Sequence, residues 1–100
     1  MTHIIKFRIG EHPEWAKMAN AIRQKVFVEE QKVDPEIEYD DHEEEAWHYI
    51  LFKNDVPVAT ARWRKTENGI KLERFATLKE HRYQGLGGML LKRVLDDVRP

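Results

Sequence analysis

The sequence has 100 residues, of which 41% are hydrophobic. This suffices for one core and predicts a single soluble globular domain over residues 1–100. Lys and Arg number 17 and Asp and Glu number 18, so the formal net charge of -1 argues against general nucleic-acid binding. The absence of cysteine excludes disulfides and thiolate nucleophiles, and we expect a cytoplasmic protein with no secretory leader and no membrane span.

The first half of the chain predicts a strand followed by a long helix. Apolar residues at positions 4–9 are typical of a short strand. Pro13 suits the first turn of a helix, and apolar residues recur every three or four positions as far as Val26, which predicts a helix over residues 13–31. Pro35 ends this helix, because the residue before a proline disfavours helical geometry.

The second half predicts three strands and a second helix. Apolar runs over residues 47–52, 58–64 and 70–78 are separated by turn-forming segments, which predicts three consecutive antiparallel strands. Apolar residues at helical spacing then predict a helix over residues 85–99. This order of elements indicates an α+β fold.

The turn before the last helix reads Arg82-Tyr83-Gln84-Gly85-Leu86-Gly87-Gly88. Each glycine there costs about 0.5–1 kcal/mol relative to alanine, so the placement requires a reason. Glycines let a ligand approach the backbone, and the first helical turn presents N–H groups and the positive end of the helix dipole, which suits a phosphate. The alternative is a strained loop with a flexible helix start.

The spacing distinguishes this turn from two common phosphate loops. A P-loop would end in Gly-Lys-Ser or Gly-Lys-Thr, which does not follow here, and a dinucleotide fingerprint would place its third glycine at Leu90. The pattern that remains is Arg/Gln-x-x-Gly-x-Gly/Ala, which Arg82, Gly85 and Gly87 match.

With these residues the sequence resembles the GNAT N-acetyltransferase superfamily, whose coenzyme A pyrophosphate motif has this form. Residues 72–78 are similar to the strand before that motif. Residues 22–31, which include Val-Phe-Val-Glu-Glu-Gln, are similar to the first-helix signature of a bacterial subgroup. The resemblance implies the acyl-CoA N-acyltransferase fold, with a mixed, mainly antiparallel sheet and flanking helices. It also implies direct acetyl transfer from acetyl-coenzyme A to a small-molecule or peptide amine.

The resemblance implies that the backbone of residues 75–77 meets the pantetheine arm. A change of apolar phase between Leu72 and Phe75 also indicates a β-bulge, which would free these backbone groups from the sheet. Lys79, Lys92 and Arg93 would reach the phosphates or lie on a solvated face. The residues expected to bind coenzyme A are Phe75, Ala76, Thr77, Arg82, Tyr83, Gln84, Gly85, Leu86, Gly87 and Gly88.

Two residues are expected to act in catalysis. The Phe75 N–H would donate to the thioester carbonyl, and one such donor is typically worth about 3 kcal/mol. Glu73 lies two residues earlier, on the same face if the strand is regular, and is the carboxylate best placed to take the proton of the amine. The alternative for Glu73 is a surface carboxylate paired with Arg74 or Lys71.

The acceptor pocket is assigned to Glu38, Asp40 and His48, which fall where the bacterial subgroup carries a Glu, an Asp and a His. The alternative for His48 is a hydrogen-bonded core residue on an apolar strand. The acidic run over residues 40–45 would select a cationic acceptor or form a solvated loop. We expect no metal, because the spacing of His42 and His48 misses that of zinc hydrolases.

The resemblance implies a fold truncated after its third helix, because a complete GNAT fold continues with a fifth strand, a fourth helix and two more strands. The chain would then be the N-terminal and central part of an acetyltransferase, or a homodimer would cover the open sheet edge. The competing interpretations are a non-catalytic module that binds coenzyme A or a protein partner, and a structural interaction domain without a cofactor.

Overall fold

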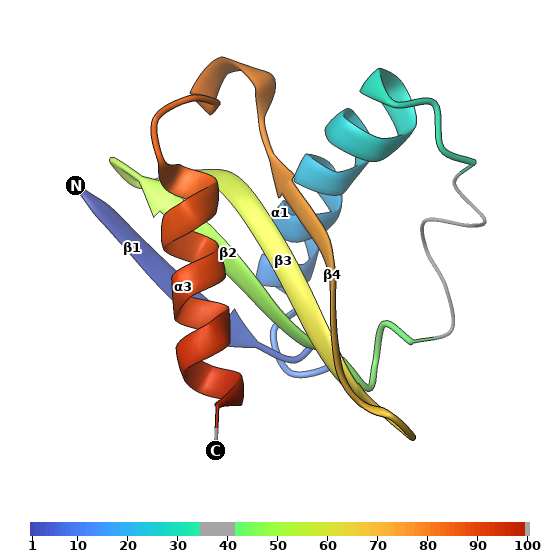
Figure 1. The fold of residues 1–100 in the computed structure, drawn as a ribbon. Coiled ribbons are helices and arrows are strands. Elements are labelled where there is room, and N and C mark those ends of the chain that lie inside the picture. Colours follow the sequence, from blue (N-terminus) through green and yellow to red (C-terminus); the bar gives the residue numbers. More distant parts are fainter. Residues whose placement is uncertain (35–41, 100) are drawn as a thin grey trace.

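The centre of the molecule is a four-stranded antiparallel sheet in the order β1-β2-β3-β4, with a helix packed on each face (Figure 1). The computed structural model describes residues 1–34 and 42–99. The strands and helices are β1 (Thr2–Phe7), β2 (Trp47–Lys53), β3 (Val56–Thr66), β4 (Gly69–Thr77), α1 (Pro13–Arg23) and α3 (Leu86–Val98). The α+β class is therefore confirmed, and the three strand pairings among the described residues are antiparallel.

Hydrophobic side chains cover both faces of the sheet. Leu86, Leu90 and Val94 of α3 pack on one face against a core that contains Trp63. The other face packs against α1 through a cluster made up of Phe7, Ala16, Ala19, Ile50 and Phe52. The central strands are therefore buried on both sides, which explains why their apolar runs are almost continuous.

The first helix changes form at its midpoint. The helix predicted over residues 13–31 is α-helical only to Arg23 and continues as a π-helical segment, η1 (Gln24–Glu30). Val26 in this segment joins the core beside Ile22, and Glu30 at its end contacts Arg82. π-Helical turns inside helices are frequent at functional sites, and this one brings the end of the helix to the predicted phosphate loop.

Strand β4 contains the predicted bulge. Glu73 pairs with Arg62 and Ala76 with Thr60, so β4 has one more residue than β3 across this stretch. Arg74 within the bulge has a left-handed backbone with φ of 58°, a conformation that residues other than glycine rarely adopt. The bulge is therefore confirmed.

The bulge corrects one expectation. Glu73 contacts Arg62 on the α1 face, whereas Phe75 packs against the core beneath α3. The two side chains thus lie on opposite faces of β4, and the expectation that they share a face is wrong. An extra residue in a strand reverses the alternation of side chains beyond it.

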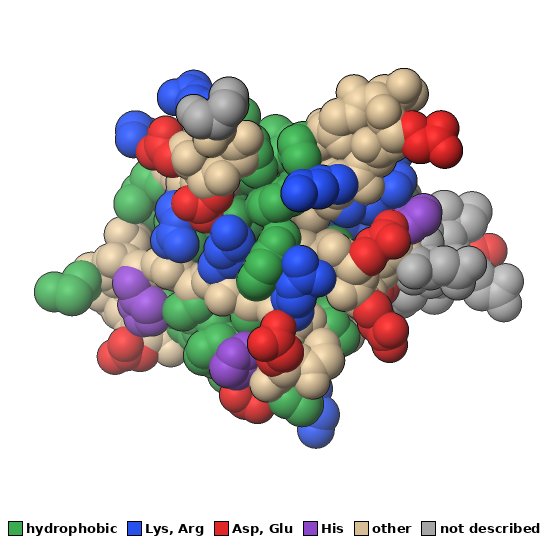
Figure 2. Space-filling view, turned by 90° about the horizontal axis from the view of Figure 1, so that it is seen from below, with side chains coloured by type: hydrophobic (Ala, Val, Ile, Leu, Met, Phe, Trp, Pro, Cys, Tyr) green, Lys and Arg blue, Asp and Glu red, His purple; other side chains and the backbone are tan. Residues whose placement is uncertain are grey.

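Charges of both signs are interspersed on the surface. Figure 2, seen from below Figure 1, shows acidic, basic and hydrophobic side chains side by side. Ile70 on β4 and Met89 and Leu91 on α3 are large hydrophobic side chains that remain exposed. Within residues 1–34 and 42–99, the helices are too short or too polar to cross a membrane.

Candidate functional site

The segment between β4 and α3 borders an open pocket at the N-terminal end of α3. After a short 3-10 turn, η2 (Lys79–His81), the backbone reverses through two left-handed residues, Tyr83 (φ 64°) and Gly85 (φ 78°). The pocket has a volume of about 350 Å³. It is lined by Thr77, His81, Arg82, Tyr83, Gly85, Leu86, Gly87 and Gly88. Seven of the residues expected to bind coenzyme A therefore line one pocket.

Backbone N–H groups at the start of α3 are available to a ligand in this pocket. The first intrahelical bond runs from the Met89 N–H to the Gly85 carbonyl at 3.1 Å, and the preceding first-turn N–H groups have no acceptor within the helix. A Cβ atom at Gly88 would meet nothing within 4 Å, and one at Gly87 would meet only the Thr77 hydroxyl at 3.6 Å. Packing within the described chain does not require these two glycines, whereas a ligand close to the backbone would.

The Arg82 side chain is engaged by the protein itself. Its Nε donates to the Thr77 carbonyl at 3.0 Å, and its Nη1 and Nη2 each donate to one carboxylate oxygen of Glu30 at 2.5 Å. The hydrogen bond with Arg82 lowers the pKa of Glu30, and the same bond raises the pKa of Arg82. Sequence analysis did not identify Glu30 as part of the site, although its Val-Phe-Val-Glu-Glu-Gln motif was singled out.

Other side chains considered for the phosphates bind elsewhere. Lys92 and Arg93 form ion pairs one helical turn further along α3, with Asp96 at 3.0 Å and Asp97 at 3.1 Å. The side-chain oxygen of Gln84 accepts a hydrogen bond from Lys53 Nζ at 2.5 Å. Arg82, Lys92 and Arg93 thus each have a carboxylate partner, whereas the first-turn N–H groups of α3 have no acceptor within the helix.

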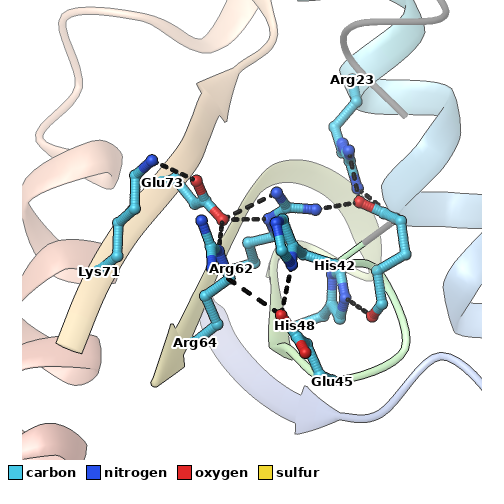
Figure 3. Close-up of polar contacts among 9 residues, drawn as sticks. Arg23, His42, Glu45, His48, Arg62, Arg64, Lys71 and Glu73 are labelled. Atoms are coloured by element: carbon cyan, nitrogen blue, oxygen red, sulfur yellow. Dashed lines mark hydrogen bonds and ion pairs between the residues drawn. The ribbon is translucent and has the colours of Figure 1, made fainter. Parts of the chain in front are cut away.

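On the α1 face of the sheet, charged side chains form a connected row (Figure 3). Arg23 binds both oxygens of Glu43 at 2.8 Å, and Arg62 bridges Glu43 and Glu73. Arg64 extends the row by donating to Glu73 at 2.9 Å. Arg23 and Arg62 are 1% and 0% exposed, and such buried charges are tolerable because each has a carboxylate partner.

Glu73 is a buried carboxylate held by arginines. One oxygen accepts from Arg62 Nε at 3.0 Å and Nη2 at 2.8 Å and from Arg64 Nε, while Lys71 Nζ lies 3.6 Å from the other. Burial raises the pKa of Glu73, but Arg62 and Arg64 outweigh burial, and the net effect lowers it. Glu73 is therefore ionised at neutral pH, with Lys71 as one of several partners.

His48 lies in the core beside this row. Its Nε2 is 2.9 Å from the Glu43 carbonyl oxygen, and its ring lies 5.7 Å from that of Phe7. Burial lowers the pKa of His48 and keeps the ring neutral at pH 7. This arrangement is that of a hydrogen-bonded core histidine, the alternative considered for it. Glu38 and Asp40 lie outside the described residues.

The His42 ring contacts Glu45, with Nδ1 2.5 Å from Oε1. Over the described ranges 1–34 and 42–99, no three His, Asp or Glu side chains are grouped as metal ligands would be.

Comparison with known proteins gives one family match. The model of the acetyltransferase (GNAT) family matches residues 14–100. The chain is 40% identical over 88 residues to the uncharacterized N-acetyltransferase YjcF of Bacillus subtilis. That alignment includes 88% of this chain and 63% of YjcF, so the chain spans less than two thirds of that relative.

Two solved structures share the fold. Escherichia coli ElaA superposes with a TM-score of 0.84 at 23% identity, over 98% of this chain and 70% of that one. The N-acetylglutamate synthase of Neisseria gonorrhoeae, complexed with coenzyme A and N-acetyl-glutamate, superposes with a TM-score of 0.66 at 22% identity. That match includes 99% of this chain and 23% of the synthase.

Proposed function

Because the chain belongs to the acetyltransferase (GNAT) family, we propose that it binds acetyl-coenzyme A and passes the acetyl group directly to an amine. The observation that carries the proposal is the open pocket at the start of α3, whose N–H groups and glycines suit a diphosphate. Coenzyme A bound to the structurally similar synthase supports this choice of ligand. We propose direct transfer, which is supported by the lack of cysteine and serine within these 100 residues.

The end of β4 is proposed to hold the pantetheine arm and the thioester. Phe75 lies in the bulge, where the register between β4 and β3 shifts. Its N–H is proposed to donate to the thioester carbonyl, and Ala76 and Thr77 are proposed to offer backbone groups to the arm. One such donor is typically worth about 3 kcal/mol in the transition state.

Glu73 is proposed to receive the proton of the attacking amine, directly or through water. A lysine-like amine with a pKa of about 10.4 is almost entirely protonated at pH 7 and therefore needs a proton acceptor. The lowered pKa of Glu73 makes it a weak base. The amine is therefore proposed to attack in its neutral form. Glu73 would then take a proton from the positively charged nitrogen of the tetrahedral intermediate, which is more acidic than the free ammonium, as the coenzyme A thiolate leaves.

The acceptor pocket is proposed to include Glu38 and Asp40, whose carboxylates would attract a cationic amine. His48 is buried against Phe7 and bonded to the Glu43 backbone. It would support the pocket through that backbone rather than touch the amine.

Calorimetric titration with coenzyme A tests the phosphate-loop assignment. Gly87→Leu should place a side chain in the pocket at a helical position without backbone strain, and should weaken binding by at least about tenfold. Gly10→Leu is the control, because a Cβ at Gly10 meets nothing within 4 Å and the residue lies outside the pocket. Wild-type affinity in Gly87→Leu would show that the diphosphate binds elsewhere.

A thiol-release assay with acetyl-coenzyme A and a panel of amines tests transfer. Release of the coenzyme A thiol that depends on the amine would support the proposed acetyltransferase activity. Binding of coenzyme A without amine-dependent release would instead indicate a non-catalytic coenzyme A-binding module.

A further inference from the structure

The predicted phosphate loop, residues 82–88, contacts the end of η1 through a side-chain pair, Glu30 with Arg82, which we name the Glu30–Arg82 clamp. We propose that Glu30 is a positioning residue for coenzyme A: it holds Arg82 so that the backbone N–H groups of residues 83–88 face the diphosphate. This inference rests on the proposed function. It gives Glu30 a positioning role that the acetyl-transfer chemistry alone does not require.

The clamp uses both ends of the guanidinium group. Nη1 and Nη2 bind the two oxygens of Glu30 in a bidentate pair, while Nε donates back to the Thr77 carbonyl at the end of β4. Arg82 therefore joins three segments: the end of β4, the loop and the end of η1. Bidentate arginine–carboxylate pairs fix geometry as well as contributing energy.

The other side chains of this segment are held to different degrees. Tyr83 is fully exposed, Gln84 accepts a hydrogen bond from Lys53 Nζ, and Leu86 at the start of α3 is buried in the core. The two left-handed residues, Tyr83 and Gly85, must nevertheless keep their conformation for the N–H groups to converge. Arg82 immediately precedes this reversal, so fixing its side chain fixes where the reversal begins.

The charge of Glu30 distinguishes positioning from direct binding. If Arg82 served mainly as a cation for the diphosphate, the carboxylate of Glu30 would oppose it, and removing that carboxylate would strengthen coenzyme A binding. If Glu30 positions the loop, removing it weakens binding although the site loses a negative charge. The two interpretations predict changes of opposite sign.

The clamp also gives a physical link between two motifs that are far apart in the sequence, because one residue of each motif contacts the other. Glu30 belongs to Val-Phe-Val-Glu-Glu-Gln, and Arg82, 52 residues later, is the first residue of the glycine motif. The π-helical turn of η1 carries Glu30 to the loop.

Coenzyme A titration of Glu30→Gln against Glu29→Gln tests the proposal. Glu29 is the exposed neighbour of Glu30. Glu29→Gln therefore removes one negative charge from the same end of η1 as Glu30→Gln does. We expect Glu30→Gln to raise the dissociation constant about fivefold, Glu30→Asp to restore part of the affinity, and Glu29→Gln to match wild type. In the transfer assay, Glu30→Gln should raise KM for acetyl-coenzyme A and leave kcat within about twofold. Unchanged or tighter binding in Glu30→Gln would overturn the proposal.

Amide hydrogen exchange without coenzyme A provides a second readout. Exchange in residues 82–88 should be faster in Glu30→Gln than in wild type, and unchanged in Glu29→Gln. Equal exchange of residues 82–88 in wild type, Glu30→Gln and Glu29→Gln would overturn the proposal that the clamp orders the loop. If wild type failed to bind coenzyme A, the proposed function would fail, but exchange would still decide whether Glu30 orders the loop.

Discussion

At the residue scale, Glu73 is held as an anion by the arginines around it. Glu73→Gln should lower the free energy of unfolding at neutral pH by about 3 kcal/mol, because fully buried Arg62 loses one of its carboxylate partners. Glu67→Gln, in the exposed β3–β4 turn, is the control and should change stability little. Urea unfolding at neutral pH measures both.

The pH dependence of this difference follows from the lowered pKa of Glu73. A carboxylate with a lowered folded-state pKa stabilises the protein above its unfolded value, here the ordinary 4.5, and loses that contribution as pH falls through the folded value. The stability gap between wild type and Glu73→Gln should therefore shrink below about pH 4.5. A gap independent of pH would show that the charge of Glu73 is not what stabilises the fold.

Sequence analysis identified Glu73, its contact with Lys71 and the glycine turn, but not the arginines that hold Glu73 or the carboxylate that binds Arg82. Arg62 is a charged residue within the nearly continuous buried run of β3, and only the sheet register brings it to Glu73. Arg82 was expected at the phosphate, yet it binds Glu30. Long-range pairs of charged side chains leave no periodic signal along a chain.

At the element scale, the β4 bulge depends on the left-handed backbone at Arg74. Arg74→Gly and Arg74→Ala both remove the contacts of the arginine side chain. The difference between their free energies of unfolding therefore reports on the backbone conformation. Glycine normally destabilises a strand, but here Arg74→Gly should be more stable than Arg74→Ala by about 1 kcal/mol. Thermal and urea unfolding measure the difference, and a more stable Arg74→Ala would argue against the left-handed conformation.

The elements themselves were largely predictable, and their irregularities only partly so. The strand expected over residues 70–78 is β4, and the helix expected over residues 85–99 is α3. The bulge was indicated because one extra residue moves Phe75 to the opposite apolar phase. The π-helical form of η1 was not indicated, because Ile22 and Val26 have the four-residue spacing that an ordinary α-helix also gives.

At the scale of the whole molecule, the two cores share one sheet and should unfold together. Leu90→Ala removes a side chain that is 1% exposed and should lower the free energy of unfolding by about 3 kcal/mol. Leu91→Ala, the matched control on the same helix at 40% exposure, should cost less than about 1 kcal/mol.

Tryptophan fluorescence and far-ultraviolet circular dichroism should follow the same urea transition in both leucine variants. Trp63 lies in the core beneath α3 and Trp15 of α1 packs on the other face, and the dichroism signal includes both helices, so each probe reports on both faces of the sheet. Separate transitions would mean that the two faces of the sheet are not energetically coupled.

The left-handed kink in β4 has a consequence for how molecules meet in concentrated solution. Among the described residues, β4 stands at one end of the strand order, and no strand of residues 1–34 or 42–99 pairs with its outer side. A flat edge would act as a template for intermolecular strand addition, the first step toward fibrils. The kink at Arg74 divides this edge into two short stretches, which makes strand addition along it less favourable.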